Sequence, residues 1–216
     1  SKHWPGATVF WQVDISGRVR TGKVMLYNPE NGRRIKEPHN YITWVHSLLK
    51  KENFNLRQCL FGEHLLTSDQ QRPVALVESE KSALISSFYL PQYLWIASGG
   101  KNGAFNRDAM SVLLFPDLGA TDYWNSKMEM IRSLGIEVSL FDFMERNATK
   151  EERDAGYDIA DFLLREETKE AILNRLITLN PALKTLVETF DLQLVDVKKA
   201  PFSATVQHAR EGLFKR

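Results

Sequence analysis

The stretch that decides the fold is Val74-Ala-Leu-Val-Glu78-Ser-Glu80-Lys81-Ser-Ala-Leu84. It opens with four apolar residues, the pattern of a strand that is buried on both faces of a parallel sheet. Residues 80–90 then have helical character. Glu78 stands between the two, and open α/β sheets bind their ligands just beyond the carboxyl ends of the strands. The stretch therefore predicts a strand–helix unit with a carboxylate at the edge of the sheet.

The same alternation continues after this unit. Three more apolar runs follow at residues 93–97, 111–115 and 136–141, and helical segments fit between them, most clearly at 123–134. Strand and helix alternating at this spacing is typical of a parallel sheet flanked by helices. The fold class that we predict is therefore α/β, with a central parallel sheet.

The flanking regions have other patterns. Residues 8–27 alternate apolar and polar side chains around a Ser16-Gly17 turn, which predicts a β-hairpin. The polar stretch at 68–73 is a boundary, and the chain after Tyr157 is mostly helical in pattern. We predict a β-rich N-terminal lead-in over residues 1–70, the α/β domain over 71–166 and a helical tail over 167–216.

Composition narrows the class of protein. The chain has 216 residues, of which 43% are hydrophobic and 25% charged, as in ordinary globular proteins. It shows no apolar run near the roughly 20 residues that span a bilayer and no signal peptide, so we expect no membrane partner. Cys59 is the only cysteine, which excludes disulfides within the chain and fits a reducing cytoplasm. The net charge of +1 means that any nucleic-acid binding needs a local basic patch.

Acidic residues recur where strands end. If the strands at 74–77 and 111–115 are neighbours, Glu78 and Asp117 face each other across the sheet edge, where carboxylates suit a hard cation such as Mg²⁺. Glu78 could instead cap the next helix or be solvated, and Asp117 and Asp122 could cap the helix after them. Asp158 and Asp161 are spaced to share a helix face, although an acidic first turn of a helix is the commonest explanation of such a pair.

Three segments together resemble a known family. Val77-Glu78-Ser79-Glu80-Lys81, Phe115-Pro116-Asp117 and Asp158-Ile-Ala-Asp161-Phe-Leu-Leu resemble, in order and spacing, the toprim domain of primases, topoisomerases and some nucleases. The likeness covers about residues 72–165. It is nearest to primase-like toprim proteins of phages, plasmids and other mobile elements, of the bacterial replicative primase type.

The resemblance implies roles for these residues. Glu78 would be the general acid/base or a metal ligand, and Asp117 the main ligand of Mg²⁺ (or Mn²⁺). Asp158 and Asp161 would lie near the same metal. The implied function is Mg²⁺-dependent nucleotidyl or phosphoryl transfer in DNA replication, with single-stranded DNA and nucleotides as partners and a replicative helicase as a further candidate partner.

Two positions depart from the family pattern. The glycine that usually follows the motif glutamate is Ser79, and the second acid of the usual Asp-x-Asp pair is Gly119. Asp122 is the candidate replacement for that acid. The departures bear on polymerising activity more than on the fold. They keep two rival functions open, a toprim nuclease and a degenerate module that binds nucleic acid or a helicase without catalysis.

Basic residues complete the predicted site. Arg18, Arg20 and Lys23 lie on the hairpin, and Lys81 and Lys101 flank the sheet edge, where they could contact phosphates. A solvated hairpin edge that blocks strand pairing explains Arg18 to Lys23 equally well. For Arg33 and Arg34 we favour the solvated interpretation. The tryptophans, including Trp11, Trp95 and Trp124, are assigned mainly to the core.

Overall fold

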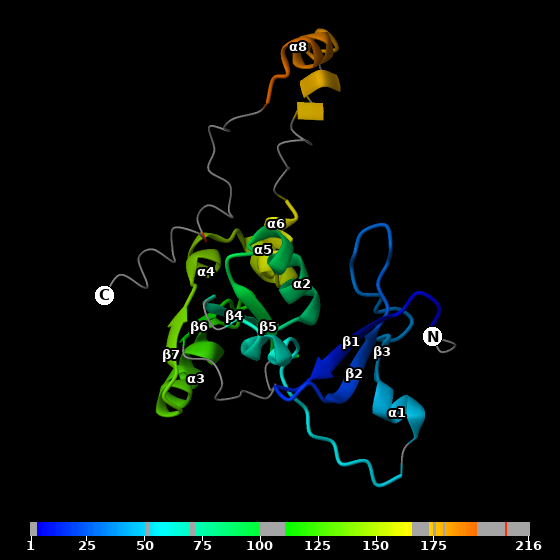
Figure 1. Cartoon of the computed structure of the whole chain (residues 1–216), viewed down its shortest axis with the longest axis vertical. Helices are drawn as coiled ribbons and strands as arrows, with labels where there is room; N and C mark the ends of the chain where they lie inside the picture. The colour runs from blue at the N-terminus through cyan, green and yellow to red at the C-terminus, as the bar shows by residue number, and fades with distance from the viewer. Residues whose placement is uncertain are drawn as a thin grey trace.

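The computed structural model describes residues 4–50, 52–69, 72–99, 111–165, 173–174, 176–178, 180–193 and 206. Within them lie an antiparallel sheet near the N-terminus and a parallel sheet flanked by helices (Figure 1). None of the helices described is both long enough and apolar enough to cross a membrane.

The N-terminal lead-in is a three-stranded antiparallel sheet. Its strands β1 (Thr8–Val13), β2 (Val19–Met25) and β3 (Ile42–Trp44) lie in the order β1-β2-β3. The predicted hairpin is confirmed, because β1 and β2 pair from Thr8↔Met25 to Val13↔Val19. Strand β3 was not predicted. It has only three residues and pairs with β2 across an intervening loop, after which α1 (Val45–Leu49) begins.

The predicted parallel sheet is confirmed. Strands β4 (Val74–Val77), β5 (Leu94–Ala97), β6 (Ser111–Leu114) and β7 (Glu137–Leu140) lie in the order β5-β4-β6-β7, and every neighbouring pair is parallel. The chain thus winds outward from β4 in both directions. Since β4 and β6 are neighbours, the segments that follow them leave the same edge of the sheet side by side.

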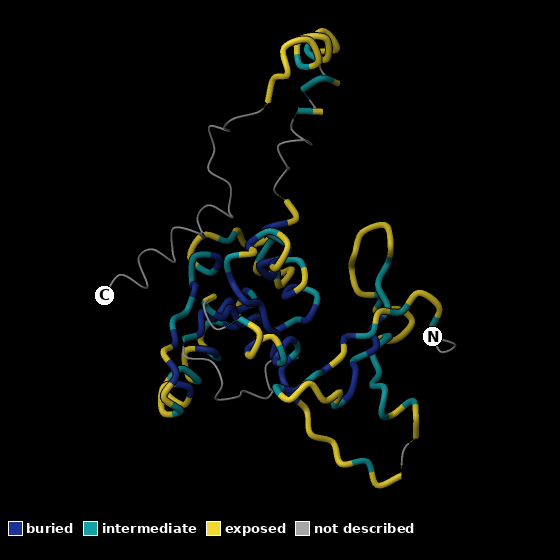
Figure 2. The backbone as a smooth tube through the Cα atoms, in the orientation of Figure 1, coloured by how far each residue is buried: buried dark blue, intermediate teal, exposed yellow. Residues whose placement is uncertain are grey.

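Helices cover both faces of this sheet, which explains why its strands are apolar at nearly every position. One face packs against α2 (Glu80–Tyr89), α4 (Phe143–Asn147) and α6 (Ile159–Leu163) through residues such as Val77 and Leu113. The other face packs against α3 (Thr121–Ser133) and the 3₁₀ helix η1 (Glu63–Thr67) through alternate residues such as Leu76 and Val112. Figure 2 shows the sheet as the most deeply buried part of the fold.

The remaining described helices lie outside these layers. Helix α5 (Lys150–Ala155) links α4 to α6 and ends at Gly156, whose φ of 63° is the left-handed conformation that favours glycine. Helix α8 (Ala182–Phe190) lies in the C-terminal tail and confirms the helical character predicted for it. Much of that tail, including residues 167–172 and 194–205, lies outside the described residues.

The lead-in sheet is docked on the parallel-sheet domain. Phe61, near the end of the lead-in, pairs with Ala97 at the end of β5 through two backbone hydrogen bonds of 2.9 and 3.0 Å. The ring of Phe10 on β1 packs edge-on against Phe61, with 5.8 Å between the ring centroids. Polar contacts described below reinforce this joint, and a cleft lies between the lead-in and helices α2 and α6.

Two local expectations were wrong. Trp11 is 47% exposed, because it lies on the face of β1 opposite to Phe10 and Gln12, the side chains that point into the molecule. Helix α3 begins at Thr121 rather than Tyr123, so Asp122 lies within its first turn and is not its N-cap. Trp95 and Trp124 are buried as expected, with 4% and 6% of their surface exposed.

Candidate functional site

The two acids predicted to form the centre of the site follow adjacent strands. Leu76 on β4 pairs with Leu114 on β6, and Phe115 N–H donates to the Leu76 carbonyl at 2.9 Å. Continuing this register sets Glu78 level with Pro116, and Asp117 comes one residue later. Neighbouring strands lie about 4.8 Å apart. The structure therefore brings Glu78 and Asp117 to the same edge of the sheet, as the sequence pattern predicts.

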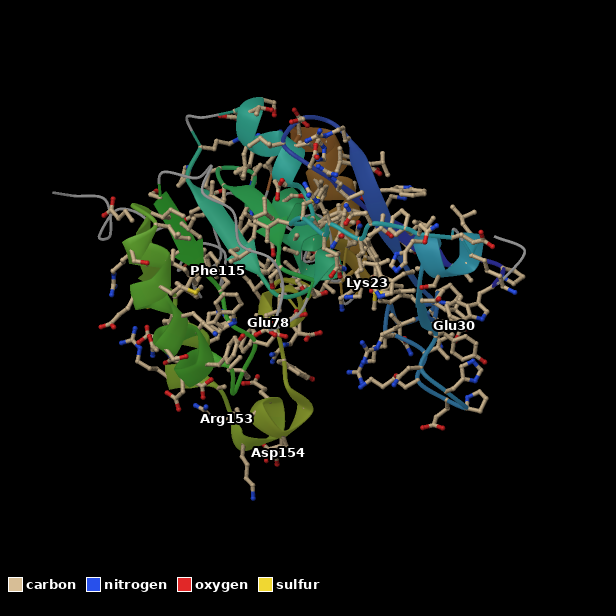
Figure 3. The ribbon with its side chains drawn as sticks, turned by 90° about the horizontal axis from the view of Figure 1, so that it is seen from below. Lys23, Glu30, Glu78, Phe115, Arg153 and Asp154 are labelled. Carbon is tan, nitrogen blue, oxygen red and sulfur yellow. The ribbon has the colours of Figure 1, made fainter. Side chains whose placement is uncertain are left out.

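Glu78 is held by a tryptophan. The indole Nε1–H of Trp124 on α3 donates to Glu78 Oε1 at 3.0 Å, and Glu78 is only 7% exposed. An indole N–H is a donor and never an acceptor, so the partner oxygen on Glu78 must accept. The bond fixes the carboxylate at the sheet edge and ties it to the helix that follows Asp117. In Figure 3, Glu78 is seen between Phe115 of the sheet and Lys23 of β2.

The loop after Asp117 is held by an acid from another element, Glu145 on α4, which was not singled out from the sequence. Gly119 N–H donates to Glu145 Oε2 at 2.9 Å, and Thr121 Oγ1 donates to the same oxygen at 3.4 Å. Glu145, on α4, also forms an ion pair with Arg153. Gly119 has a φ of 80°, which favours glycine over a second motif aspartate. Asp122 is exposed in the first turn of α3, where a negative charge complements the helix dipole.

Asp158 and Asp161 form a reciprocal cap at the start of α6. Asp158 Oδ1 accepts from the Asp161 N–H at 3.1 Å, and Asp161 Oδ2 accepts from the Asp158 N–H at 3.0 Å. Asp158 Oδ2 also accepts from the hydroxyl of Ser82 on α2 at 2.6 Å. This pair therefore has a structural role at the start of a helix, in agreement with the alternative interpretation given for it in the sequence analysis. It does not remove the pair from the site, because both residues line the cleft described below.

Arg18 and Arg20 are bound at the tip of the hairpin. Their guanidinium groups contact Asp14 Oδ2 at 3.0 and 2.6 Å. Burial raises the pKa of Asp14, but hydrogen bonds from Arg18, Ser16 and Arg20 outweigh it and lower the pKa to about 2. Neither arginine lines the cleft between the sheets, so the structure separates them from the acidic edge.

Lys23 joins the two sheets. Its Nζ contacts Glu80 Oε2 and the Gly99 carbonyl, each at 3.2 Å, and 14% of the lysine side chain and 2% of the Glu80 side chain are exposed. Breaking such a buried pair by removing one partner typically costs about 3–5 kcal/mol. Lys23 is thus held in a buried ion pair and does not line the cleft described below. Lys101 lies outside the described residues.

A polar cleft opens between the lead-in and the start of α2. Its volume is about 450 Å³, and its charged lining consists of four cations and two acids: Arg33, Arg34, Lys36, Lys81, Asp158 and Asp161. Ser79, directly after Glu78, lines it as well. Of the predicted phosphate-binding residues that the structure describes, only Lys81 lies here. The loop cations at Arg33 and Arg34 join it, although their sequence pattern favoured a solvated surface.

Two tyrosines border the same cleft, Tyr27 and Tyr157. Burial raises the pKa of the Tyr27 hydroxyl to about 12, and the nearby charge of Glu80 adds to this effect while Arg34 opposes it. Tyr27 therefore stays neutral at physiological pH and can serve the cleft only as a hydrogen-bonding or stacking group.

The donor set at the sheet edge is compatible with Mg²⁺, which prefers one or two carboxylates completed by water and phosphate. Glu78 and Asp117 supply two carboxylates at adjacent strand ends. No cluster of three or more His, Cys, Asp or Glu side chains arranged as a metal site occurs among the described residues.

Sequence reasoning missed Trp124, Ser82 and Glu145 as neighbours of the acids. Each contacts its partner across a gap in the chain, and the Trp124–Glu78 bond spans 46 residues. No local pattern marks such a pair. The Arg33-Arg34 cluster was visible in the sequence, but only the docking of the two sheets turns it toward Lys81.

Two of the solved structures that the chain matches are primases. The crystal structure of the Aquifex aeolicus primase (zinc binding and RNA polymerase domains) matches with a TM-score of 0.46 and 14% identity, over 84% of this chain and 45% of that one. The RNA polymerase domain of Mycobacterium tuberculosis primase DnaG matches with a TM-score of 0.42 and 11% identity, over 95% of this chain and 70% of that one. The chain thus spans less than half of the first of these structures.

Comparison of the sequences gives a family rather than an activity. No curated protein matches the chain. The family described as "Domain of unknown function (DUF6371)" matches residues 1–118, which include the lead-in and strands β4 to β6. The match covers more than half of the chain, and the protein therefore belongs to the DUF6371 family.

Proposed function

We propose that this protein is a primase-like, toprim-related module that acts on single-stranded DNA in replication by Mg²⁺-dependent nucleotidyl or phosphoryl transfer. The observation that carries the proposal is the placement of Glu78 and Asp117 directly after the neighbouring parallel strands β4 and β6. The resemblance of both segments to toprim motifs supports it, as does the cationic cleft beside the same edge.

The residues divide into two roles. Glu78 and Asp117 would hold Mg²⁺, with Asp122 and the Asp158–Asp161 pair near enough to assist through water. When bound, the metal would neutralise charge on the phosphate oxygens of the substrate. Trp124 keeps the Glu78 carboxylate at the edge, so little reorganisation is needed when a substrate arrives.

The cations of the cleft would position the substrate. Arg33, Arg34, Lys36 and Lys81 surround the entrance next to Ser79, and guanidinium groups suit phosphates because they donate two parallel hydrogen bonds. Phosphoryl transfer depends mostly on positioning and on charge neutralisation. Such a cleft next to two carboxylates supplies both.

A specific observation supports a second candidate, a module that binds nucleic acid without catalysis. The position of the missing second motif acid, Gly119, has a φ of 80° and its N–H is bound by Glu145. This loop is built for glycine and is stabilised as it stands. A degenerate acidic edge beside an intact basic cleft would bind DNA but not process it.

One set of assays separates these functions. Primer synthesis on a single-stranded template, plasmid nicking and DNA binding would be measured for the wild type, Glu78→Gln and Asp117→Asn. The matched control is Glu137→Gln, which changes an exposed glutamate at the opposite, N-terminal end of β7. We expect primer synthesis to fall about 10³-fold in both site variants, within the range for loss of an acid/base group, and to persist in the control.

Other outcomes decide against this assignment. Nicking with the same sensitivity to both variants would identify a nuclease. DNA binding that survives both substitutions, without product in either assay, would identify the non-catalytic module. Activity that is equal in the wild type and both variants would remove the sheet edge from the mechanism.

A further inference from the structure

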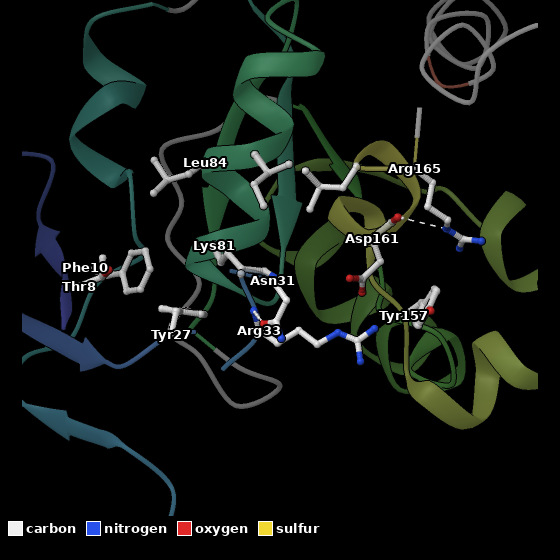
Figure 4. A pocket seen from close by; sticks show the side chains of 13 residues that line it. Thr8, Phe10, Tyr27, Asn31, Arg33, Lys81, Leu84, Tyr157, Asp161 and Arg165 are labelled. Atoms are coloured by element: carbon white, nitrogen blue, oxygen red, sulfur yellow. Dashed lines mark hydrogen bonds between the residues drawn. The ribbon is translucent and has the colours of Figure 1, made fainter. Parts of the chain in front are cut away.

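An apolar groove continues from the polar cleft along α2. Its volume is about 670 Å³, and its apolar lining consists of Phe10, Tyr27, Leu84, Ile85, Tyr157 and Leu164. Figure 4 shows Leu84 and Lys81 on α2 facing Tyr27 and Phe10 of the lead-in, with Asp161 and Arg165 on the far side. The groove is open along α2, where Leu84 is 51% and Phe88, one turn later, 79% exposed.

Helix α8 has a matching uncovered face. None of its residues is buried, and Leu186 and Phe190, one helical turn apart, are 47% and 66% exposed. In Figure 1, α8 lies apart from both sheets. Two helices that each expose apolar side chains four residues apart can pack these rows against each other.

The chain confines α8 to the neighbourhood of the groove. Arg165, which lines the groove, precedes α8 by the 16 residues 166–181, a length that can span at most about 60 Å. On the other side, Val206 is fully buried in the core and its carbonyl accepts a hydrogen bond from the Tyr93 hydroxyl at 3.3 Å. A helix tethered at both ends experiences an effective concentration of its docking site in the millimolar range.

Charges favour the same pairing. Lys81, Arg33 and Arg165 contribute cations to the groove. The exposed side of α8 carries Glu188, and Asp191 follows at its C-cap. Lys184 is its single cation and lies 3.8 Å from Glu188. A slightly acidic helix thus faces a basic rim, which would orient it on approach.

From these features we propose that the α2 groove is a docking site for an amphipathic helix and that its occupant is α8 of the same chain. Leu186 and Phe190 pack onto Leu84, Phe88 and Leu164. Since Lys81 and Arg33 line both the groove and the polar cleft, docked α8 covers part of the phosphate-binding surface. This last step, competition with nucleic acid, rests on the proposed function, whereas the docking itself does not.

A disulfide-trapping experiment tests the docking without nucleic acid. The variant Leu84→Cys/Leu186→Cys is oxidised in dilute solution, and Val19→Cys/Leu186→Cys is the control because Val19 is 61% exposed on the lead-in hairpin. The native Cys59 is 7% exposed, and burial raises the pKa of its thiol to about 12, so it reacts slowly. We expect the Leu84 pair to close within one chain at least about tenfold faster than the control.

Every other trapping result overturns the proposal. Equal rates for the two pairs would show that α8 has no preferred site. A disulfide that forms only between chains would assign the groove to a second copy. All the substituted residues are exposed, so loss of folding does not obscure the result.

The covering role is tested with Phe190→Glu, which removes the apolar contact and would place a charged side chain against the apolar lining of the groove, where it loses its hydration. If α8 occupies the groove in half to nine-tenths of the molecules, affinity for single-stranded DNA rises about two- to tenfold. Met130→Glu, on α3 at the opposite face of the sheet, is the matched control. Unchanged affinity with selective trapping would refute the covering role. Absence of any DNA binding would instead refute the proposed function.

Discussion

Two pairs of acids lie beside the cleft, and they are held in different ways. Asp158 and Asp161 start one helix and are satisfied by backbone N–H groups and by Ser82. Glu78 and Asp117 follow two different strands, and Glu78 accepts a hydrogen bond from the indole N–H of Trp124 on α3. The first pair is required by the local structure around it. The second is placed by the topology of the sheet.

This difference separates a structural acid from a candidate functional one. An N-cap aspartate contributes to folding wherever its helix begins, so its presence says little about chemistry. A carboxylate at a sheet edge, buried and fixed by a neutral donor, contributes little that a glutamine could not supply. We therefore expect the two pairs to respond oppositely to substitution.

The largest expected effect on stability is for Asp158→Ala. The change removes the N-cap of α6, which costs about 0.5–2 kcal/mol, and it leaves the fully buried Ser82 hydroxyl without its acceptor, which costs about 1–3 kcal/mol. Denaturant unfolding should show a loss of about 2–4 kcal/mol. Glu78→Gln should cost less than about 1 kcal/mol, because the amide oxygen still accepts the Trp124 bond.

The matched variants are Ser82→Ala and the double variant Ser82→Ala/Asp158→Ala. If the two side chains act through their mutual hydrogen bond, the double variant should lose clearly less than the sum of the single losses. A change below about 0.5 kcal/mol for Asp158→Ala would make the capping role negligible and return this pair to the list of functional acids.

The fold was more predictable than the site. Four short apolar runs identified the strands because residues buried on both faces, such as Leu76 and Leu113, leave no polar position in the pattern. The pairing of β4 with β6 was assumed from the sequence only as a condition for the acidic site, and the structure shows it. Strand β3 was not predicted, because three residues are too few to show an alternation of apolar and polar side chains. Its pairing with β2 also depends on the closure of the loop between them.

The candidate site was predictable only where it depends on strand ends. The positions of Glu78 and Asp117 follow from the sheet, which the sequence pattern describes. The partners of the site residues do not, because Lys23 reaches Glu80 across 57 positions and Trp124 reaches Glu78 across 46. Such contacts are set by how whole elements dock. The same docking turns the Arg33–Lys36 loop into a wall of the cleft.

A smaller effect sharpens the comparison at Trp124. We expect a double-mutant cycle between Trp124→Phe and Glu78→Met to give a coupling of about 1 kcal/mol, the usual net value of one hydrogen bond. Trp95→Phe is the matched control, because Trp95 is equally buried, donates to the Leu90 carbonyl at 2.9 Å and packs on the opposite face of the sheet. Its cycle with Glu78→Met should be additive within about 0.5 kcal/mol. Coupling of equal size in both cycles would mean that Glu78 depends on general packing rather than on the indole.

The smallest effect concerns Asp14, an acid that is held by cations and so represents a third case. Its pKa is lowered from 3.8 to about 2, so the folded state binds fewer protons than the unfolded state between these values. Its stabilising contribution is complete above about pH 4 and is lost as the pH falls through 2, since stability rises with pH wherever the unfolded chain binds more protons.

Asp14→Asn should therefore flatten the dependence of the unfolding free energy on pH between about 4 and 2. Arg18→Met should flatten it partly, because Arg18 supplies part of the lowering of the Asp14 pKa. An unaltered slope in Asp14→Asn would show that the arginines do not stabilise this carboxylate and are available to other anions, which would return Arg18 and Arg20 to the set of phosphate-binding candidates.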